Sequence, residues 1–243
     1  MSYQSVAELK GIARDKMLGN YGTAIGAFLF IRFIIITGMM LASYVAGNNM
    51  FINLVIVFAL MLLEGIFVYG ELAIYLKISV GMKAEAGDIF SAFKGSADKA
   101  IRARMVLAII VYGAFLVGAG MEYVVSLFNI GSASLVMTVG WIVIAAVCIY
   151  FLLTYSQIIY YLQDFSDITV LEACRRSRKL MDGNKLTLLG MCISFIPMYI
   201  VGVISMMIGL YFVHPYVKMT LTEFYLDRVR QSQPQTNSFD TTV

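Results

Sequence analysis

The chain has 243 residues, of which 60% are hydrophobic and 14% charged, and its formal net charge is +3. Soluble domains carry roughly 25% charged residues, and a soluble fold of this size buries only about 70–75% of its surface, too little to hide this apolar surplus. The composition excludes an ordinary soluble domain, and the small positive charge argues against nucleic acid as a partner. Both features fit a membrane protein whose basic loops face anionic lipid.

The chain opens with a charged amphipathic segment, Val6–Gly26, which lacks the apolar core and cleavage site of a signal peptide. We therefore expect this segment to be retained. A membrane-spanning helix needs about 20 mainly apolar residues. Four such stretches follow, at Gly22–Ala46, Phe51–Leu76, Met105–Phe128 and Leu135–Tyr160. A longer apolar region, Leu186–Leu226, has room for two spans, and we expect a break near Gly202–Gly209.

Basic residues gather in two connecting segments, Lys77–Arg104 and Tyr161–Lys185, whereas the connections at Gly47–Asn49 and Asn129–Ser134 contain no Lys or Arg. By the positive-inside rule, the basic segments face the cytoplasm. The basic end of the last region, near Arg230, favours the same side, so the number of crossings is even. We predict an all-α polytopic helix bundle of about six transmembrane helices, arranged as three hairpins in the cytoplasmic (inner) membrane. Both termini are then cytoplasmic; the alternative is five crossings.

The opening segment recurs later in the chain. Val6–Gly26 and Val170–Gly190 align without a gap at an offset of 164. The identities are Val6/Val170, Glu8/Glu172, Arg14/Arg178, Met17/Met181, Gly19/Gly183, Asn20/Asn184, Thr23/Thr187 and Gly26/Gly190. In the second copy Leu171, Cys174 and Met181 form a narrow apolar stripe against a basic face, which is typical of a helix lying in the headgroup layer. We expect the glycine to end each surface helix and the asparagine to N-cap the next helix.

A weaker third copy begins at Asp88, before the middle hairpin. The sequence thus predicts three tandem units, each an amphipathic interfacial helix on the cytoplasmic side followed by a hairpin. The alternative is that unrelated entry segments share this basic amphipathic design. We take residues 1–230 as one transmembrane domain and residues 231–243, a polar stretch, as a disordered tail.

Two ionisable residues lie within the first hairpin. Arg32 lies sixteen positions before Asn48 in the outer turn, and Glu64 lies sixteen positions after it. Antiparallel helices that share this turn place both residues at one depth, so we predict an Arg32–Glu64 ion pair. Charges in the bilayer are costly and normally face a partner. The pair could be a structural clasp or a counter-ion pair in a solute or proton path.

Further polar residues extend this candidate intramembrane polar cluster, which comprises Arg32, Glu64, Glu71, His214 and Lys218. Glu71 lies two helical turns after Glu64 on the same face. Lys218, on the last apolar region, is a candidate partner for Glu71. His214, the single histidine, could be a hydrogen-bonded structural residue or a proton shuttle. A separate set of cations, Arg175, Arg176, Arg178 and Lys179, is the candidate contact to anionic headgroups.

Enzyme signatures are weak. The chain contains no HExxH, GxSxG or Walker motif. Cys148, Cys174 and Cys192 form no CxxC pair, so we expect no disulfide, no metal site and no cofactor. No residue is proposed as catalytic.

Four motifs carry a resemblance to a known family. They are "DIFSAFK" after the second span, "ITVLEACRRSRKLMDGNK", "CISFIP", and "IGLYFVHPYVKMTLTEFYLDRV". The chain resembles the bacterial integral membrane family catalogued as domain of unknown function 975, over most of its length beyond Gly65. The fourth span departs from that family because it lacks Pro-Gly, so we expect a straighter helix there. More distantly, the pattern is similar to the membrane domain of glycerophosphodiester phosphodiesterases, without their catalytic domain. The resemblance implies a multi-spanning membrane protein and brings no activity or site.

We therefore expect a non-enzymatic scaffold or accessory protein. Its partners would be anionic lipids of the cytoplasmic leaflet and a membrane protein or a second copy of the chain, and not nucleic acid. The alternative is a small transporter or channel with a polar intramembrane path. An intramembrane lipid-modifying enzyme is a third hypothesis.

Overall fold

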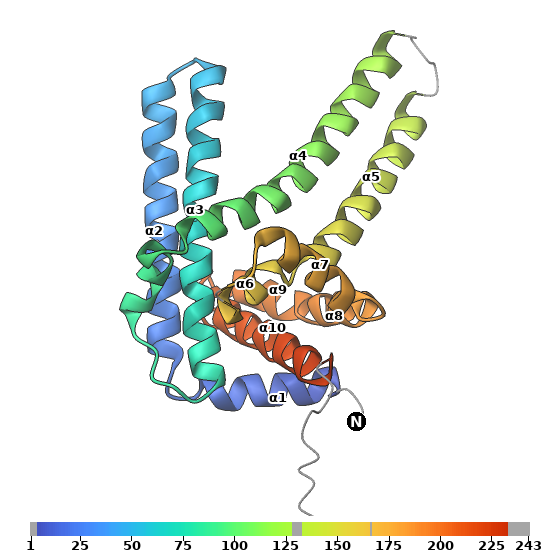
Figure 1. Cartoon of the computed structure of the whole chain (residues 1–243). Coiled ribbons are helices and arrows are strands. Elements are labelled where there is room, and N and C mark those ends of the chain that lie inside the picture. The colour runs from blue at the N-terminus through green and yellow to red at the C-terminus, as the bar shows by residue number, and fades with distance from the viewer. Residues whose placement is uncertain (1–3, 128–132, 166, 233–243) are drawn as a thin grey trace, which may run out of the picture.

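The computed structural model describes residues 4–127, 133–165 and 167–232 (Figure 1). Within these ranges the regular structure is entirely helical. The α-helices are α1 Val6–Met17, α2 Tyr21–Ala46, α3 Met50–Ser79, α4 Ala97–Leu127, α5 Ala133–Tyr155, α6 Ile158–Asp164, α7 Val170–Met181, α8 Lys185–Ser194, α9 Ile196–Ile204 and α10 Leu210–Ser232. A 3₁₀ helix, η1 Ala86–Lys94, lies between α3 and α4.

Five segments of the described chain are helical, long and apolar enough to cross a membrane. They are α2, α3, α4, Met137–Asp164 and Lys185–Ile204. The described part of the chain is therefore all-helical, and its five apolar helices are consistent with a multi-pass membrane protein. The first outer turn lies where it was predicted, because α2 ends at Ala46 and α3 begins at Met50. The side chain of Asn49 caps α3 by accepting hydrogen bonds from the backbone N–H groups of Phe51 and Ile52.

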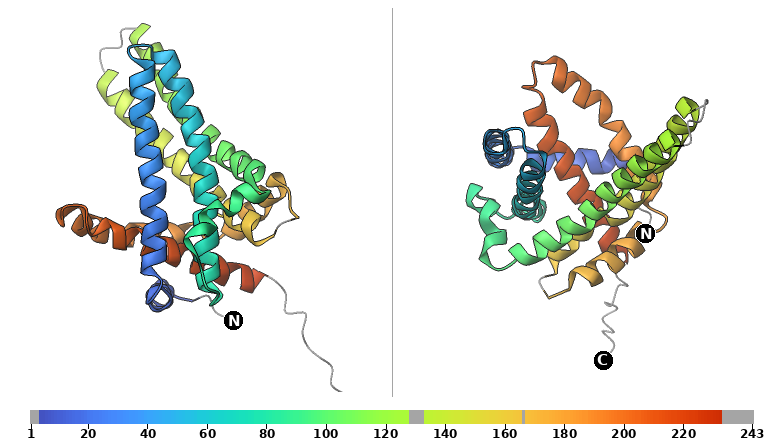
Figure 2. Two further views of the ribbon diagram at one scale, coloured as in Figure 1. Left: turned by 90° about the vertical axis from the view of Figure 1, so that its left-hand side faces the viewer. Right: turned by 90° about the horizontal axis from the view of Figure 1, so that it is seen from above.

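The helices form two hairpins that rise from a common base. Helices α2 and α3 run antiparallel, and α4 and α5 form a second hairpin that leans away from them (Figure 1). Helices α1 and α10 lie across the lower end of the first hairpin, with α8 and α9 beside α10 at the same level, and we call this layer the base (Figure 2). The third apolar region therefore does not stand beside α2 and α3 as a parallel hairpin. Helix α10 is not among the five apolar segments, so the sixth crossing stays a prediction.

Helix α10 is the central element of the base. It contributes to all three hydrophobic clusters: Tyr225 to the first, Met219 to the second and Phe224 to the third. Its second half carries Glu223 and Arg228, which are buried among the surrounding helices. A helix with this charge cannot face hydrocarbon on all sides, because each buried ion needs a protein partner. Lys16 of α1 and Ser79 of α3 are the partners of Glu223, and Asp227 of α10 itself is a partner of Arg228.

The break predicted near Gly202–Gly209 is confirmed, because α9 ends at Ile204 and α10 begins at Leu210. In this turn Met206 and Met207 adopt left-handed φ values of 55° and 68°. The two glycines meet closely, since a Cβ added to Gly209 would lie 2.8 Å from the Cα of Gly202. Two further breaks were not predicted: between α8 and α9, where Pro197 lies in the first turn of α9, and at Ser156–Gln157. The fourth span is therefore not straight over its whole predicted length.

The two segments related by the offset of 164 have the same local structure. Ser5 and Thr169 each accept a hydrogen bond from the backbone N–H of the glutamate three residues later, at 3.2 Å. Gly19 and Gly183 then end α1 and α7 with φ values of 84° and 78°. The fully buried positions also coincide, namely Leu9/Ala173, Ala13/Ser177, Met17/Met181, Ala24/Leu188, Ala27/Met191 and Ile31/Phe195. Each segment is therefore a short helix, a glycine turn and a second helix with one buried face, although α2 has 26 residues and α8 only 10.

The predicted role of the two asparagines is wrong. Neither Asn20 nor Asn184 makes a side-chain cap hydrogen bond to the helix that follows. Instead, each side-chain amide donates backwards, to the carbonyl of Lys16 at 2.9 Å and of Leu180 at 2.8 Å. Both residues are already in the right-handed helical conformation, so the carboxamide points towards the end of the preceding helix. There it satisfies a carbonyl that the helix terminus leaves without a partner.

The predicted apolar stripe of the second copy is not turned uniformly outwards. Leu171 is 65% exposed, whereas Met181 is fully buried. The face of α7 that packs on the protein is formed by Ala173, Ser177 and Leu180, and the hydroxyl of Ser177 donates to the carbonyl of Thr154 at 2.8 Å. A protein surface therefore takes the place of lipid along much of this helix.

The predicted middle surface helix also differs, because η1 is a 3₁₀ helix. It packs on α3 at Gly70, where an added Cβ would meet the carbonyl oxygen of Ile89 at 1.8 Å. Residues 231 and 232, predicted as the start of the tail, continue α10. Residues 233–243, and Asn129–Ser132 of the predicted second outer loop, lie outside the described residues.

Candidate functional site

The predicted ion pair in the first hairpin is present. Nη1 of Arg32 lies 3.3 Å from Oε1 of Glu64, and the two side chains join α2 to α3. The equal spacing from the outer turn therefore placed both residues at one depth, as expected. The guanidinium of Arg32 also lies over the ring of Phe28, 5.4 Å from its centroid.

Sequence reasoning missed a third member of this group, Arg104. Its Nη2 lies 2.9 Å from Oε2 of Glu64, so the carboxylate is shared by two guanidinium groups from α2 and α4. The approach depends on Gly65, because a Cβ there would lie 2.7 Å from the Cβ of Arg104. Arg104 had been counted among the basic residues of the connecting segment. The sequence feature that could have indicated this contact was Gly65, next to Glu64, because a glycine permits two helices to cross closely.

A second polar pair lies nearer the base. Nε2 of His214, on α10, is 3.3 Å from Oε1 of Glu71, on α3. The hydroxyl of Tyr75 donates to the same carboxylate oxygen at 3.4 Å. The His214 ring stacks on Phe28 with centroids 4.2 Å apart. Phe28 thus lies between the two pairs, touching Arg32 on one side and His214 on the other.

The structure brings four of the five predicted cluster residues into direct pairs and leaves Lys218 at longer range. Among the described residues, no ion pair of Lys218 within 4 Å is found. The partner predicted for Glu71 is thus replaced by His214, one helical turn earlier on α10. The His214 ring nitrogen and the Tyr75 hydroxyl thus take the place of an ammonium group beside this carboxylate.

A third polar junction, which was not predicted, lies at the base. Nζ of Lys16 is 2.8 Å from Oε1 of Glu223 and 2.8 Å from the backbone carbonyl of Ser79. The hydroxyl of Ser79 donates to the same Glu223 oxygen. The junction joins α1, the end of α3 and α10. Glu223 lies within the last apolar region of the sequence, Leu186–Leu226, and its spacing there does not indicate Lys16 as a partner.

The four predicted headgroup contacts do not have equal roles. Arg175, Arg178 and Lys179 are exposed on α7. Arg176 is half-buried and forms an ion pair with Glu172, with 3.0 Å between Nε and Oε1. Its guanidinium also lies 5.2 Å from the ring centroid of Phe165. Three of the four cations are thus directed to the surroundings, and Arg176 holds the start of α7 on the protein.

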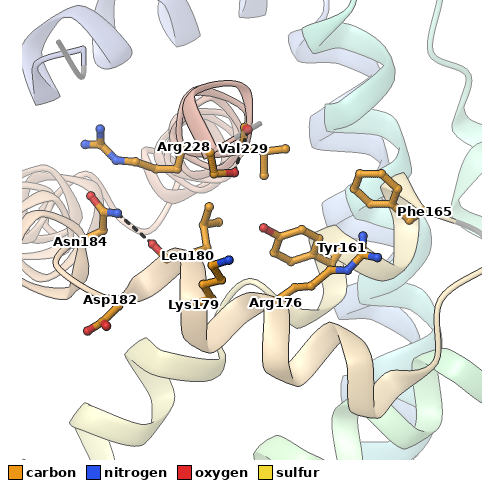
Figure 3. Close-up of a pocket in the computed structure, with 10 residues that line it drawn as sticks. Tyr161, Phe165, Arg176, Lys179, Leu180, Asp182, Asn184, Arg228 and Val229 are labelled. Atoms are coloured by element: carbon orange, nitrogen blue, oxygen red, sulfur yellow. Dashed lines mark hydrogen bonds between the residues drawn. The ribbon is translucent and has the colours of Figure 1, made fainter. Parts of the chain in front are cut away.

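A pocket of about 420 Å³ lies between α6, α7 and α10 beside this basic face. Figure 3 shows Arg176 and Lys179 on the α7 wall and Arg228 on the α10 wall, with Asp182 at one end. Asn184 lines the pocket while its amide donates to the carbonyl of Leu180 (Figure 3). Arg176 is already paired with Glu172 and Arg228 with Asp227, so among the described cations that line this pocket Lys179 is the one whose charge is available to an anionic ligand.

The site offers no metal-binding cluster. Within the described residues, no group of three or more His, Cys, Asp or Glu side chains could hold a metal ion. The thiol of Cys174, on α7, has its pKa raised by burial, so it is neutral and apolar at pH 7.

Comparison with known proteins gives one match. The family model described as "Protein of unknown function (DUF975)" matches residues 1–232. No curated protein and no solved structure matches the chain. The distant resemblance to the membrane domain of glycerophosphodiester phosphodiesterases therefore stays a prediction.

Proposed function

The chain belongs to the DUF975 family, whose function is not known, and from its own residues we propose that it is a non-enzymatic membrane scaffold that binds anionic lipid. The observation that carries this proposal is a contrast between two sets of charges. Arg32, Glu64, Glu71 and His214 are paired with one another or with Arg104. Arg175, Arg178 and Lys179 point outwards from α7.

The inner leaflet of the cytoplasmic membrane is the surface that suits this face. Its anionic lipids attract basic segments at about 1 kcal/mol per Lys or Arg. We propose that α1 and α7 lie at the cytoplasmic headgroup layer, with the base of the molecule on that side. The exposed apolar flanks of both hairpins would then contact lipid, a partner membrane protein or a second copy of the chain.

The contact between Lys16 and Glu223 supports the proposed orientation of the termini. Lys16 precedes the first apolar helix and Glu223 follows the last, yet their side chains touch. An odd number of complete crossings would place them on opposite sides of the membrane. We therefore propose that, after Lys185–Ile204, the chain returns to the side of the membrane on which Lys16 lies, and that both termini are cytoplasmic. A reporter active only in the cytoplasm, fused after Val243, tests this; an inactive, stably expressed fusion would contradict it.

We further propose that α1–α2 and α7–α8 are copies of one unit. Shared caps, shared glycine turns and six coinciding buried positions support a repeat. The middle segment supports it less, because η1 is a 3₁₀ helix. A repeat would present two similar basic entry helices to the same leaflet.

The lipid-binding proposal is tested by replacing Arg175, Arg178 and Lys179 with Gln. In vesicles that mix phosphatidylglycerol and phosphatidylethanolamine, we expect the natural protein to enrich phosphatidylglycerol around it and the triple variant to lose this enrichment. Equal enrichment by both proteins would overturn the proposal. The matched control replaces Lys83 and Lys99, which lie outside α7, with Gln.

A transporter is the alternative, and the buried Glu71–His214 pair is the observation that favours it. Such a pair could hold and release a proton along a path. Reconstituted vesicles with an internal pH indicator distinguish the two functions. Proton or solute flux that is lost in His214→Gln, with the protein still folded, would establish transport.

A further inference from the structure

An apolar groove of about 680 Å³ runs between α4 and α5. Val106, Gly113 and Val117 line it from α4, and Val147 and Phe151 line it from α5. At its basal end α7 closes the groove with the side chains of Leu171 and Cys174. Its volume is within the usual range of ligand pockets, ~300–1,000 Å³. Almost all of its surface is hydrocarbon, so its occupant must be hydrocarbon too.

The dimensions of the groove select the kind of hydrocarbon. From Val106 to Val117 the helix rises about 16 Å, close to the depth of one leaflet, since the hydrocarbon core is about 30 Å thick. A volume of 680 Å³ over this length leaves a mean cross-section of roughly 40 Å². An α-helix with its side chains is about 10–12 Å wide and would need at least twice that area. An extended acyl chain fits inside the groove, whereas a helix is too wide to enter it and could only pack over its mouth.

A basic pocket adjoins the lower end of this groove. The pocket, of about 410 Å³, is lined by Glu172, Arg175, Arg176 and Lys179. Leu171 lines both the pocket and the groove, so the two are continuous across one side chain. The negative charge of Glu172 is neutralised by its ion pair with Arg176. Among the described residues neither Arg175 nor Lys179 forms an ion pair, so their two positive charges are available to a ligand.

We propose that the groove and the basic pocket form one binding site for a single anionic phospholipid. Arg175 and Lys179 hold the phosphate at the headgroup layer, and an acyl chain lies in the groove between α4 and α5. This inference rests on the proposed binding of anionic lipid and adds a defined, stoichiometric site to it. Leu171, 65% exposed at the junction, then contacts the glycerol end of the lipid.

The groove can be filled without disturbing the fold. A Cβ added to Gly113 meets nothing within 4 Å, so Gly113→Phe places a ring in the groove rather than against the protein. Gly26 is equally open and lies on α2, away from the groove, so Gly26→Phe is the matched control. The headgroup contact is removed separately by the double variant Arg175→Gln and Lys179→Gln.

The experiment measures phospholipid that stays bound to the full-length protein. The protein is equilibrated with dioleoyl phosphatidylglycerol or dioleoyl phosphatidylethanolamine in detergent, and bound lipid is counted by native mass spectrometry. We expect one phosphatidylglycerol per chain for the natural protein and for Gly26→Phe. We expect little retention by Gly113→Phe, and an affinity reduced roughly 25-fold by the double variant. Glycerol phosphate, which has the headgroup chemistry without the acyl chains, should not bind measurably.

A second measurement needs no variant. Trp141, the single tryptophan, lies on α5 near the far end of the groove, where its ring faces Gly118. Phosphatidylglycerol brominated in the middle of its acyl chains should quench this fluorescence with saturation at one lipid per chain. Quenching that rises without saturation would show that no single chain occupies the groove.

The outcomes separate this inference from the broader proposal. Loss of lipid in the double variant but not in Gly113→Phe would leave headgroup binding standing and overturn the groove site. Equal retention by all variants would overturn both. If the protein retained phosphatidylethanolamine as well as phosphatidylglycerol, the site would not select anionic lipid. That result would overturn this inference and the lipid part of the proposed function.

Discussion

The ammonium nitrogen of Lys16 lies 2.8 Å from the carboxylate oxygen Oε1 of Glu223, although 207 positions separate the two residues. The contact ties the first helix of the chain to the last. Lys16 has a side chain 30% exposed and Glu223 one only 6% exposed, so most of the desolvation cost falls on the carboxylate. The contacts between α1, the end of α3 and α10 therefore depend on the buried carboxylate of Glu223.

Lys16→Met should destabilise the protein more than the double variant Lys16→Met with Glu223→Gln. The single change leaves a buried carboxylate with the Ser79 hydroxyl as its remaining donor, at a cost of about 1–3 kcal/mol, whereas removing both charges avoids most of that cost. For a chain of this size the melting temperature should fall by about 2–4 °C per kcal/mol. Thermal unfolding in one detergent measures both. A double variant less stable than the single one would contradict the assignment.

Glu64→Gln should cost more stability than either Arg32→Met or Arg104→Met. The carboxylate serves two guanidinium groups, so its loss leaves two charges without a partner, whereas loss of one arginine leaves the other pair intact. Because the two guanidinium side chains are 41% and 28% exposed, we expect the cost to lie at the low end of the range for an unpaired group, about 1 kcal/mol. Thermal unfolding of the three single variants in matched micelles gives the order. Arg32→Met with Glu64→Gln should not be neutral, because Arg104 remains charged.

Stability at acidic pH should depend on Asp88. Burial alone would raise the pKa of this carboxyl, but hydrogen bonds from the backbone N–H of Glu85 and from the Lys77 ammonium lower it below its usual 3.8. A lowered pKa contributes stability that is present above the unfolded value and is lost as the pH falls through the folded value. The melting temperatures of the natural protein and Asp88→Asn should thus differ at pH 6 and converge below 3.8.

The control for this pH dependence is Asp15→Asn. Asp15 faces Arg14 at the surface, where both side chains are about 70% exposed, so screening by solvent leaves little effect on stability. Its melting curve should follow that of the natural protein across the same pH range. A constant difference between Asp88→Asn and the natural protein down to pH 3 would show that Asp88 is not the titrating group.

Gly70→Ala and Gly11→Ala should have opposite effects. At Gly70 a methyl group would collide with the carbonyl of Ile89, so η1 must shift, at a cost of about 1–3 kcal/mol. At Gly11, inside α1, a Cβ meets nothing, and alanine favours the helix by about 0.5–1 kcal/mol. Melting temperatures in one detergent compare the two directly. Similar shifts in both variants would contradict the close contact at Gly70.

The sequence could predict what depends on spacing along one chain segment. The lengths of the apolar stretches predicted the spanning helices of the first two hairpins. The position of the turn at Asn48 predicted the register that pairs Arg32 with Glu64. The glycine turns at Gly19 and Gly183 followed from the local repeat. Such features depend on helical periodicity and turn geometry, which neighbouring residues determine.

Only the tertiary structure decided which distant groups meet. Arg104 reaches Glu64 because α4 crosses α3 at Gly65, and Glu223 meets Lys16 because α10 lies across the base. Neither contact follows from spacing, since each depends on the angle at which two helices pack. That angle is set by the shapes of the side chains over a whole interface. The position of a charged residue along its own helix therefore does not indicate which distant residue it will meet. The sequence by itself thus determined a helical membrane protein with one predictable ion pair, and packing decided the remaining partners.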